Sequence, residues 1–307
     1  MAIRTAATPS AAVTAVALSP ARPLAFVGDL VQLAKPRLSG LVLLTTSGGM
    51  MLAPGRIGPA RAALTVLATA AVVGAANALN CYFERDSDAL MRRTRDRPLP
   101  AGRLDPLVAL ALGLLVPVFA LPILALAAGR VTGLLALVAL VSYVAIYTPL
   151  KRRTSLALLV GAVPGAIPPL MGWTAVTGRI DAGGLALFAL LFAWQLPHFL
   201  AISLYLREDY ARGGLKVFSL VHGEPATRRA IAATSLLLPP IALVPAALGL
   251  MGPVSTGVAL AASLAFTAFA LLGLTRRGEA PGWARRIFLA TLVHLVVVMA
   301  ALVAGAP

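Results

Sequence analysis

The sequence has few of the residues that form disulfides, metal cages and solvated surfaces. Among its 307 positions are one cysteine, three histidines and 11 acidic residues. The single cysteine, Cys81, excludes an internal disulfide and a cysteine-based metal cage. Charged residues make up 12% of the chain and hydrophobic residues 59%, and the mean hydropathy is +0.90. This composition argues against a soluble protein and is typical of one embedded in a lipid bilayer.

The excess of positive charge does not indicate a nucleic-acid-binding protein. The formal net charge is +15, but the basic residues are scattered between apolar segments. Neither an aromatic platform nor a zinc-ligand spacing lies near them. We therefore expect no nucleic-acid partner and attribute the basic residues to membrane topology.

The apolar runs predict an all-α, polytopic membrane protein with nine transmembrane helices. Each run is roughly 17 to 25 residues long, enough to cross a hydrocarbon core about 30 Å thick. The predicted spans are 38–54, 60–83, 104–128, 131–149, 155–177, 182–206, 230–250, 253–275 and 285–306. We expect residues 28–307 to form a single membrane-embedded domain. Residues 1–27 are expected to form a flexible cytoplasmic tail, because they lack the long apolar core of a secretory signal.

The distribution of lysine and arginine predicts the orientation of these spans. Of the 26 basic residues, 22 precede the first span or follow an even-numbered span, and the other four lie on the opposite side. Because positively charged loops stay in the cytoplasm, we expect a cytoplasmic N-terminus and a C-terminus on the opposite side of the cell (inner or plasma) membrane. The loops after spans two, four and six hold most of the unusual polar residues, so the active face is expected to be cytoplasmic.

A stripe of polar side chains ends the second predicted span, in the stretch "NCYFERDSDALMRRTRDRPLP". Asn77, Asn80, Glu84 and Asp88 are separated by three, four and four residues, which places them on one face of a helix. Asp86 lies about 200° around the helix from Glu84, at 100° per residue, and is excluded from this face. Two carboxylates and a carboxamide are hard oxygen ligands of the kind that Mg²⁺ uses.

The arginines that follow this stripe predict a phosphate site. Arg92, Arg93, Arg95 and Arg97 carry forked donors that match phosphate oxygens. The alternative is a solvated cytoplasmic loop in which the acids only pair with arginines. Two amides deeper in the apolar helix weigh against that alternative, because polar groups at membrane depth are costly and usually line a cavity.

Two further polar clusters end the fourth and sixth predicted spans. In "YTPLKRRT", Tyr147 and Lys151 are four residues apart; a lysine suits a diphosphate and a phenol ring can shield a cation. Anchoring at the membrane interface is the alternative. In the sixth span His198 lies within an apolar run, followed by Glu208 and Asp209 at the cytoplasmic end. For this histidine a packing role is the alternative to a functional one.

These stretches together resemble the UbiA superfamily of intramembrane prenyltransferases, and in particular its heme-modifying branch. The first signature of the superfamily, an Asn and two acids at four-residue spacing before a basic loop, matches Asn80, Glu84 and Asp88. Further matches lie between positions 35 and 288: "KPR", "RT" and "RP" within 93–98, "YTPLKR", "GAIPPLMGW", "WQLPHF", "EDYARGG" and "ARRIF".

The sequence departs from the superfamily pattern in two places. Glu84 stands where the superfamily generally has Asp. In the region of the second aspartate-rich motif only Glu208 and Asp209 are acidic, which puts a second metal site in doubt; the heme branch has the "PHF" and "EDY" pattern there instead.

The resemblance implies a helical bundle around a central cavity that opens to the cytoplasm. It also implies transfer of the farnesyl group of farnesyl diphosphate to a vinyl group of heme B, giving heme O and diphosphate. Catalytic roles are implied for Asn80, Glu84, Asp88, Tyr147 and Lys151, the first three holding Mg²⁺. Substrate binding is implied for Asn77, Arg93, Arg97, His198, Glu208 and Asp209. Heme B is then a substrate and not a cofactor; binding of a downstream heme A synthase or oxidase-assembly factor is left open.

Three other functions compete with this expectation. A UbiA-type prenyltransferase acting on an aromatic quinone precursor is expected to retain the second aspartate-rich motif. A transporter is disfavoured because the acids cluster at one membrane face and no pair of matching interrupted segments is present. A heme-binding assembly factor without catalysis is the third alternative.

Overall fold

Every regular element in residues 23–306, the part of the chain that the computed structural model describes, is a helix. This confirms the predicted all-α fold. The elements are α1 (Pro23–Leu33), α2 (Pro36–Leu52), α3 (Pro59–Leu90), α4 (Pro106–Ala128), α5 (Arg130–Val141), the π-helix η1 (Ser142–Tyr147), α6 (Thr148–Leu150), α7 (Ala157–Thr177), α8 (Ala182–Tyr205), α9 (Arg207–Arg212), α10 (Phe218–Ser235), α11 (Leu238–Ala247), α12 (Pro253–Leu272), the 3₁₀-helix η2 (Arg276–Glu279) and α13 (Trp283–Ala304). Most of the predicted tail, residues 1–22, lies outside the described residues, and α1 begins at Pro23.

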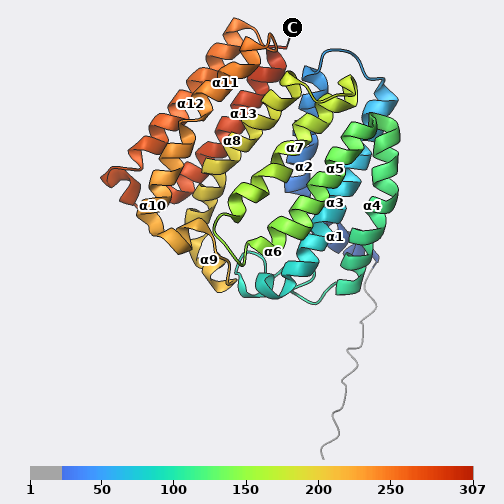
Figure 1. Cartoon of the computed structure of the whole chain (residues 1–307). Helices are drawn as coiled ribbons and strands as arrows, with labels where there is room; N and C mark the ends of the chain where they lie inside the picture. Colours follow the sequence, from blue (N-terminus) through green and yellow to red (C-terminus); the bar gives the residue numbers. More distant parts are fainter. Residues whose placement is uncertain (1–22, 307) are drawn as a thin grey trace, which may run out of the picture.

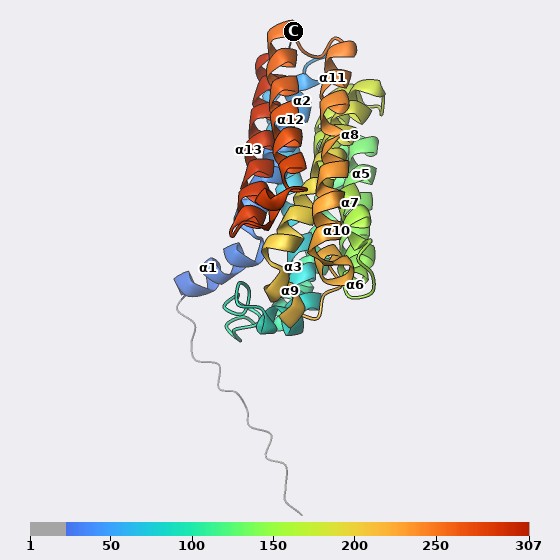
Figure 2. The same cartoon turned by 90° about the vertical axis from the view of Figure 1, so that its left-hand side faces the viewer.

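The long helices run side by side in a bundle, with α2, α7 and α8 between an outer group formed by α3 to α5 and another formed by α10 to α13 (Figure 1). The most extensive contacts join α3 to α4, α2 to α7, and α7 to α8. The short helix α1 lies at an angle to the bundle axis at its lower end (Figure 2). The described chain therefore begins at the lower end of the bundle and finishes at the upper end, which agrees with an odd number of crossings.

Eight helical segments of the described chain are long and apolar enough to cross a membrane. The remaining predicted span corresponds to α2, which has 17 residues, so the count of nine stays a prediction. One boundary differs from expectation: the span expected at 230–250 begins with α10 at Phe218 and continues as α11. The helix α3 continues past the end of the predicted span at residue 83 to Leu90, as the shared face of Asn80, Glu84 and Asp88 requires. Proline at residues 239 and 240 sits at the start of α11, where a missing N–H breaks no helical bond.

The outer surface of the bundle is apolar, as a bilayer requires. On α4, Leu115 and Phe119 are 59% and 68% exposed, whereas the buried face of the same helix carries Ala109, Gly113 and Ala120. Small residues toward neighbouring helices and large apolar residues outward are the arrangement of helices packed in lipid. The chain is a multi-pass membrane protein.

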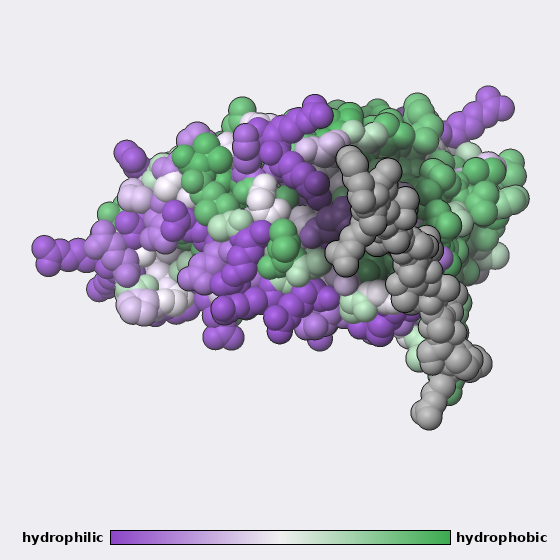
Figure 3. Space-filling model, turned by 90° about the horizontal axis from the view of Figure 1, so that it is seen from below, coloured by the Kyte–Doolittle hydropathy of each residue, from purple (hydrophilic) through white to green (hydrophobic). Residues whose placement is uncertain are grey.

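The lower end of the bundle is different in character. Seen from below, hydrophilic side chains gather over this end (Figure 3). It carries the loop between α3 and α4, the turn after α6 and the short helix α9, which are the polar segments that end the second, fourth and sixth predicted spans. The functional site lies just inside this end.

Candidate active site

A cavity of about 820 Å³ opens between the helices, a size within the usual range for small-molecule sites. Its upper wall is apolar, with side chains from α2, α3, α5, α7 and α8. Polar side chains gather at its lower end, among them Lys35, Asn80, Glu84, Asp88, Arg93, Arg97, Tyr143, Tyr147 and Lys151. The cavity thus joins a polar pocket to a long apolar space.

The four polar residues predicted on one helical face do share a face of α3. Asn77, Asn80, Glu84 and Asp88 all line the cavity and are at most 8% exposed. They align because α3 stays helical through Leu90. Asp86 points outward and its side chain is 79% exposed, so its exclusion from the stripe is confirmed.

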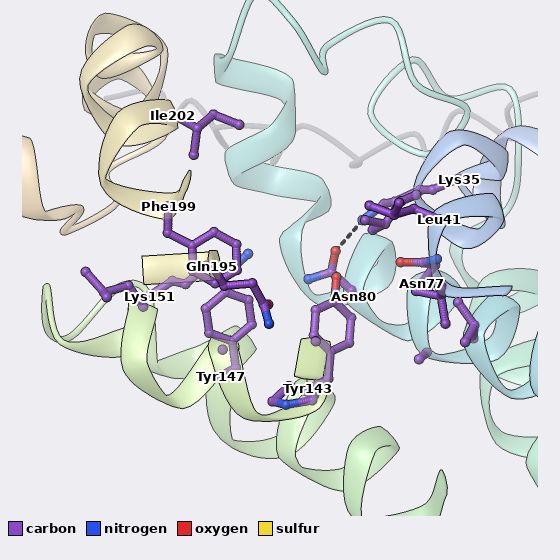
Figure 4. Close-up of a pocket in the computed structure, with 18 of the residues that line it drawn as sticks. Lys35, Leu41, Asn77, Asn80, Tyr143, Tyr147, Lys151, Gln195, Phe199 and Ile202 are labelled. Carbon is purple, nitrogen blue, oxygen red and sulfur yellow. Dashed lines mark hydrogen bonds between the residues drawn. The ribbon is translucent and has the colours of Figure 1, made fainter. Parts of the chain in front are cut away.

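Each of the three proposed metal ligands faces a cation. Lys35 donates a hydrogen bond to the carboxamide oxygen of Asn80, which is the dashed line in Figure 4. Lys151 Nζ forms an ion pair with Glu84 Oε1. Arg97 Nη1 lies 2.7 Å from Asp88 Oδ2. Because uncompensated charge is costly at membrane depth, these cations stabilise the carboxylates in the free protein.

The oxygen donors of the stripe suit a hard divalent cation. Glu84 Oε1 is buried and accepts no hydrogen bond of normal geometry from the described residues, although Lys151 lies beside it. Within residues 23–306, no three His, Cys, Asp or Glu side chains gather around one point. Two carboxylates and an amide are nevertheless enough for Mg²⁺, which usually keeps waters and substrate oxygens in its remaining positions. The donor set therefore fits this ion.

A π-helix brings the two tyrosines of the fourth span to the cavity wall. In η1 the N–H and the hydroxyl of Thr148 both bond to the carbonyl of Tyr143, five residues earlier. Tyr143 and Tyr147 stack with ring centroids 5.7 Å apart, and Lys151 Nζ lies 4.8 Å from the Tyr147 centroid. π-Helical turns of this kind often occur at functional sites.

The environment of Lys151 keeps its ammonium charged. Burial alone lowers the pKa of a lysine, but the neighbouring Tyr147 and Glu84 raise the pKa of Lys151 above its ordinary value. The residue is thus a permanent cation on the cavity wall. A cation in this position suits a diphosphate.

Glu208 and Asp209, predicted as substrate-binding residues, are not among the side chains that line the cavity. Asp209 instead accepts hydrogen bonds from the backbone N–H groups of Arg92 and Arg93 at 2.9 and 3.0 Å. Its other partner is Arg212, 3.0 Å away. Burial opposes the charged form, yet these N–H groups and Arg212 hold the pKa of Asp209 below its ordinary value. Asp209 therefore fixes the loop that carries Arg93, and Glu208 forms only an exposed pair with Arg212.

His198 lies on the cavity wall formed by α8, as its predicted role requires. Its Nδ1 atom is 2.8 Å from the hydroxyl oxygen of Thr291 on α13. Its ring stacks on Trp194 with centroids 4.6 Å apart. The other two histidines lie outside the cavity lining: His222 lies in α10, 3.0 Å from the hydroxyl of Ser155, and His294 is buried against Ser263.

Lys35 is the site residue that reasoning from the sequence did not single out. It lies between α1 and α2 with φ = 51°, the one non-glycine residue of positive φ in the described chain. Such a conformation is strained and marks functional sites. Asn77 supports this bend by donating to the carbonyl of Ala34 at 3.0 Å. The motif "KPR" was a signal, but nothing local in it shows that the lysine turns toward Asn80.

Comparison with known proteins identifies the architecture. A solved structure of digeranylgeranylglyceryl phosphate synthase matches with a TM-score of 0.77 at 14% identity, covering 91% of this chain and 98% of that one. The structure of a UbiA homolog from Archaeoglobus fulgidus bound to GPP and Mg²⁺ matches with a TM-score of 0.61 at 16% identity, covering 89% of this chain and 99% of that one. At these identities the likeness shows the fold alone.

Sequence relatives define the family. Residues 42–292 match the UbiA prenyltransferase family, so the fold and the site belong to an intramembrane prenyltransferase. A protein of Anaeromyxobacter sp. (strain Fw109-5), named protoheme IX farnesyltransferase, is 65% identical to this chain over 95% of its length and 99% of the relative's length. The chain belongs to the UbiA prenyltransferase family and, within it, to the protoheme IX farnesyltransferases.

Proposed function

We propose that this protein transfers the farnesyl group of farnesyl diphosphate to a vinyl group of heme B and so forms heme O and diphosphate. One observation carries the proposal: a single cavity joins buried carboxylates and cations at its lower end to a long apolar space above them. This shape suits a substrate with a charged head and a hydrocarbon tail. The name of the 65% identical relative supplies the acceptor, protoheme IX, and the farnesyl donor.

The reaction balances as follows. The bond between the allylic carbon and the diphosphate oxygen breaks, and its electron pair leaves with diphosphate. The allylic carbon then bonds to the terminal vinyl carbon of heme B. A water molecule adds to the cationic carbon that this leaves beside the porphyrin and releases one proton.

The departing diphosphate is matched by cations on two sides of the pocket. Lys151 projects from the end of α6, and Arg93 and Arg97 project from the loop after α3. Preorganised charges of this kind stabilise negative charge as it develops. Asn80, Glu84 and Asp88 would hold Mg²⁺, which when bound neutralises part of that charge.

The aromatic wall serves the other half of the reaction. Lys151 already lies over the ring of Tyr147, so the face of this ring is turned toward positive charge. An allylic cation is attracted to such a ring face in the same way. The apolar side chains above it exclude bulk water until the cation has reacted with the acceptor.

The same charges favour one placement in the membrane. The polar end of the cavity lies at the end of the bundle that carries the basic loops after α3 and α6. Positively charged loops stay in the cytoplasm, so the cavity is proposed to open there, with the N-terminus on the same side and the C-terminus across the cell membrane. A downstream heme A synthase or oxidase-assembly factor would receive heme O and stays a prediction.

Transfer to an aromatic quinone precursor is the second candidate. It is disfavoured because Glu84 and Asp88 are the only acids that line the cavity within the described residues. Of the two acids in the second motif region, Asp209 bonds the loop after α3 and Glu208 is exposed.

The purified full chain, farnesyl diphosphate, Mg²⁺ and heme B together test the proposal. We expect the heme to gain the mass of one farnesyl group plus one hydroxyl group, with equimolar diphosphate released. A second reaction with hydroxybenzoate in place of heme B is the control. Prenylation of hydroxybenzoate alone would establish the quinone-precursor function, and heme binding without diphosphate release would indicate an assembly factor.

A further inference from the structure

His198 is held on the cavity wall by contacts from another helix. Its ring is half-buried on α8, stacked on Trp194, and its Nδ1 lies 2.8 Å from Thr291 Oγ1 on α13. The indole N–H of Trp194 donates to the backbone carbonyl of Thr291 at 2.8 Å. Trp194 and Thr291 are both buried. The ring therefore has little freedom to turn.

The hydrogen bonds of Thr291 decide which nitrogen of His198 carries the proton. The single hydroxyl proton of Thr291 is donated to the carbonyl of Phe288 at 2.6 Å. Thr291 Oγ1 can therefore only accept from His198, so Nδ1 carries the hydrogen in the neutral ring. Nε2 then carries the lone pair, and it has no hydrogen-bond partner among the described residues.

A neutral imidazole with one nitrogen held by a hydroxyl and the other free is a metal-ligating arrangement. Histidine ligands of metals usually donate their second N–H to a fixed acceptor, which sets the tautomer and the ring orientation. Heme iron is commonly held by such a histidine. Among residues 23–306, no acidic side chain lines the cavity on the α8 side, so none of their carboxylates competes there for the imidazole.

We infer that His198 Nε2 binds the iron of the heme substrate, and that Thr291 is the positioning residue that presents this nitrogen. The inference rests on the proposed function, since it concerns the acceptor of that reaction. It places the heme on the α8 wall. In Figure 4, Gln195, Phe199 and Ile202 of this wall lie across the cavity from Asn77 and Asn80, where the diphosphate is proposed to bind.

The placement has a chemical use. A bond to the iron fixes the position of the porphyrin relative to α8. The ring can still rotate about the iron–nitrogen axis, so its contacts with the cavity wall must set which edge faces the diphosphate end. Fixing a reactant in this way supplies part of the rate enhancement of a two-substrate reaction. Axial ligation to α8 thus limits where the vinyl groups can lie relative to the farnesyl carbon.

Heme titration of the purified full chain tests this inference without turnover. We expect the Soret spectrum and the iron–histidine stretch of the ferrous complex to show one histidine ligand. His198→Gly should remove this signature and weaken heme binding about 10- to 100-fold, and added imidazole should restore the spectrum. His222→Ala is the matched control, because His222 lies outside the cavity lining, and should change neither.

The role of Thr291 is tested by two substitutions of different chemistry. Thr291→Val keeps the shape but removes the acceptor, and should shift the iron–histidine stretch and weaken heme binding about tenfold. Thr291→Ser keeps the hydroxyl and should restore both. An unshifted band in Thr291→Val would refute the positioning role.

The outcomes separate this inference from the proposed function. If the wild type makes heme O but His198→Gly leaves the heme spectrum unchanged, iron ligation is wrong and the function stands. Loss of turnover with an unchanged heme spectrum would assign His198 to proton transfer and also overturn ligation. A histidine-ligated heme without prenylation would retain the inference and reject the function.

Discussion

At the residue scale, the carboxylates of α3 are stabilised by cations that the proposed reaction also uses. Lys151 pairs with Glu84 and Arg97 pairs with Asp88 in the free protein. Burying two carboxylates without such partners would be costly. Both cations lie on the cavity wall, within reach of a diphosphate head that enters it. The ion pairs therefore keep the pocket formed until the substrate arrives.

Replacing Asp88 with Asn tests the proposed metal stripe. The change keeps the size of the side chain and removes one charged oxygen ligand. We expect heme O formation at saturating Mg²⁺ to fall roughly 100-fold. Loss of a residue that only supports a metal ligand costs about 10- to 100-fold, so loss of a ligand should reach at least the upper end of this range. Asp86→Asn is the control, since Asp86 is exposed and off the stripe. Near-normal turnover in Asp88→Asn would contradict the metal assignment.

Replacing Asp209 with Asn tests whether this residue acts on the loop after α3. The variant should release the amides of Arg92 and Arg93, because a neutral amide is a weaker acceptor than a carboxylate. We expect faster hydrogen exchange of those two amides and a higher KM for farnesyl diphosphate, with kcat changed less. Glu208→Gln is the control, because Glu208 is exposed and bonds no backbone group of that loop.

The pH dependence of this contact follows from the same carboxylate. The pKa of Asp209 in the folded protein lies below its ordinary value of about 4. Its stabilising effect is therefore complete above about pH 4 and is lost only as the pH falls through the lower, folded-state value. Wild type and Asp209→Asn should differ in amide exchange at neutral pH and converge in strong acid. Convergence already at pH 6 would contradict this assignment.

At the element scale, close helix packing depends on glycine at a few positions. A methyl group at Gly172 on α7 would collide with the backbone carbonyl of Thr46 on α2, and one at Gly49 would collide with the carbonyl of Pro169. Backbone atoms cannot yield as a side chain can. These two glycines therefore set the distance between α2 and α7, both of which line the cavity.

Gly172→Ala should separate α2 from α7. Overpacking of this kind costs about 1–3 kcal/mol, so we expect thermal unfolding several degrees below that of the wild type. Gly257→Ala on α12 is the matched control, because no atom of the described part of the chain lies within 4 Å of the added carbon. Alanine is the better helix former there, so the control should melt at the same temperature or slightly higher. Equal melting of the two variants would contradict the close-packing argument.

The elements also show where sequence periodicity succeeds and where it fails. The spacing of Asn80, Glu84 and Asp88 was enough to place them on one face, because α3 is regular. It could not show the π-helix at residues 142–147, since a wider turn arises from backbone bonds such as Thr148 N–H to Tyr143. It could not show that residues 218–222 are helical, because this segment is too short to form a span and is followed by Gly223, whose φ of 79° interrupts the helix.

At the scale of the whole molecule, the charge distribution and the bundle predict one orientation. The basic loops lie at the end of the bundle where the described chain begins, and the C-terminal helix finishes at the other end. A cytoplasmic position for the basic end lets the cavity receive a soluble diphosphate head from the cell interior.

Cysteine labelling tests this orientation, because the chain has only one native cysteine that could interfere. The one native cysteine, Cys81, is buried and should not react. Arg95→Cys and Arg179→Cys replace side chains that are 63% and 75% exposed, at opposite ends of the bundle. We expect an impermeant thiol reagent to label Arg179→Cys in whole cells. It should label Arg95→Cys only after the cytoplasmic face of the membrane has been made accessible. The reverse pattern would show the opposite orientation.

Composition and local periodicity are enough to predict the membrane class, the apolar helical spans and the stripe on α3. Its resemblance to a known superfamily indicated the reaction. Three contacts of the site became visible in the folded chain: Lys35 bonds Asn80 from 45 positions away, Asp209 bonds a loop 116 positions distant, and Thr291 on α13 bonds the ring of His198. These contacts depend on how the helices cross and pack. That geometry results from the interactions of all the helices together, so it cannot be predicted from any one segment.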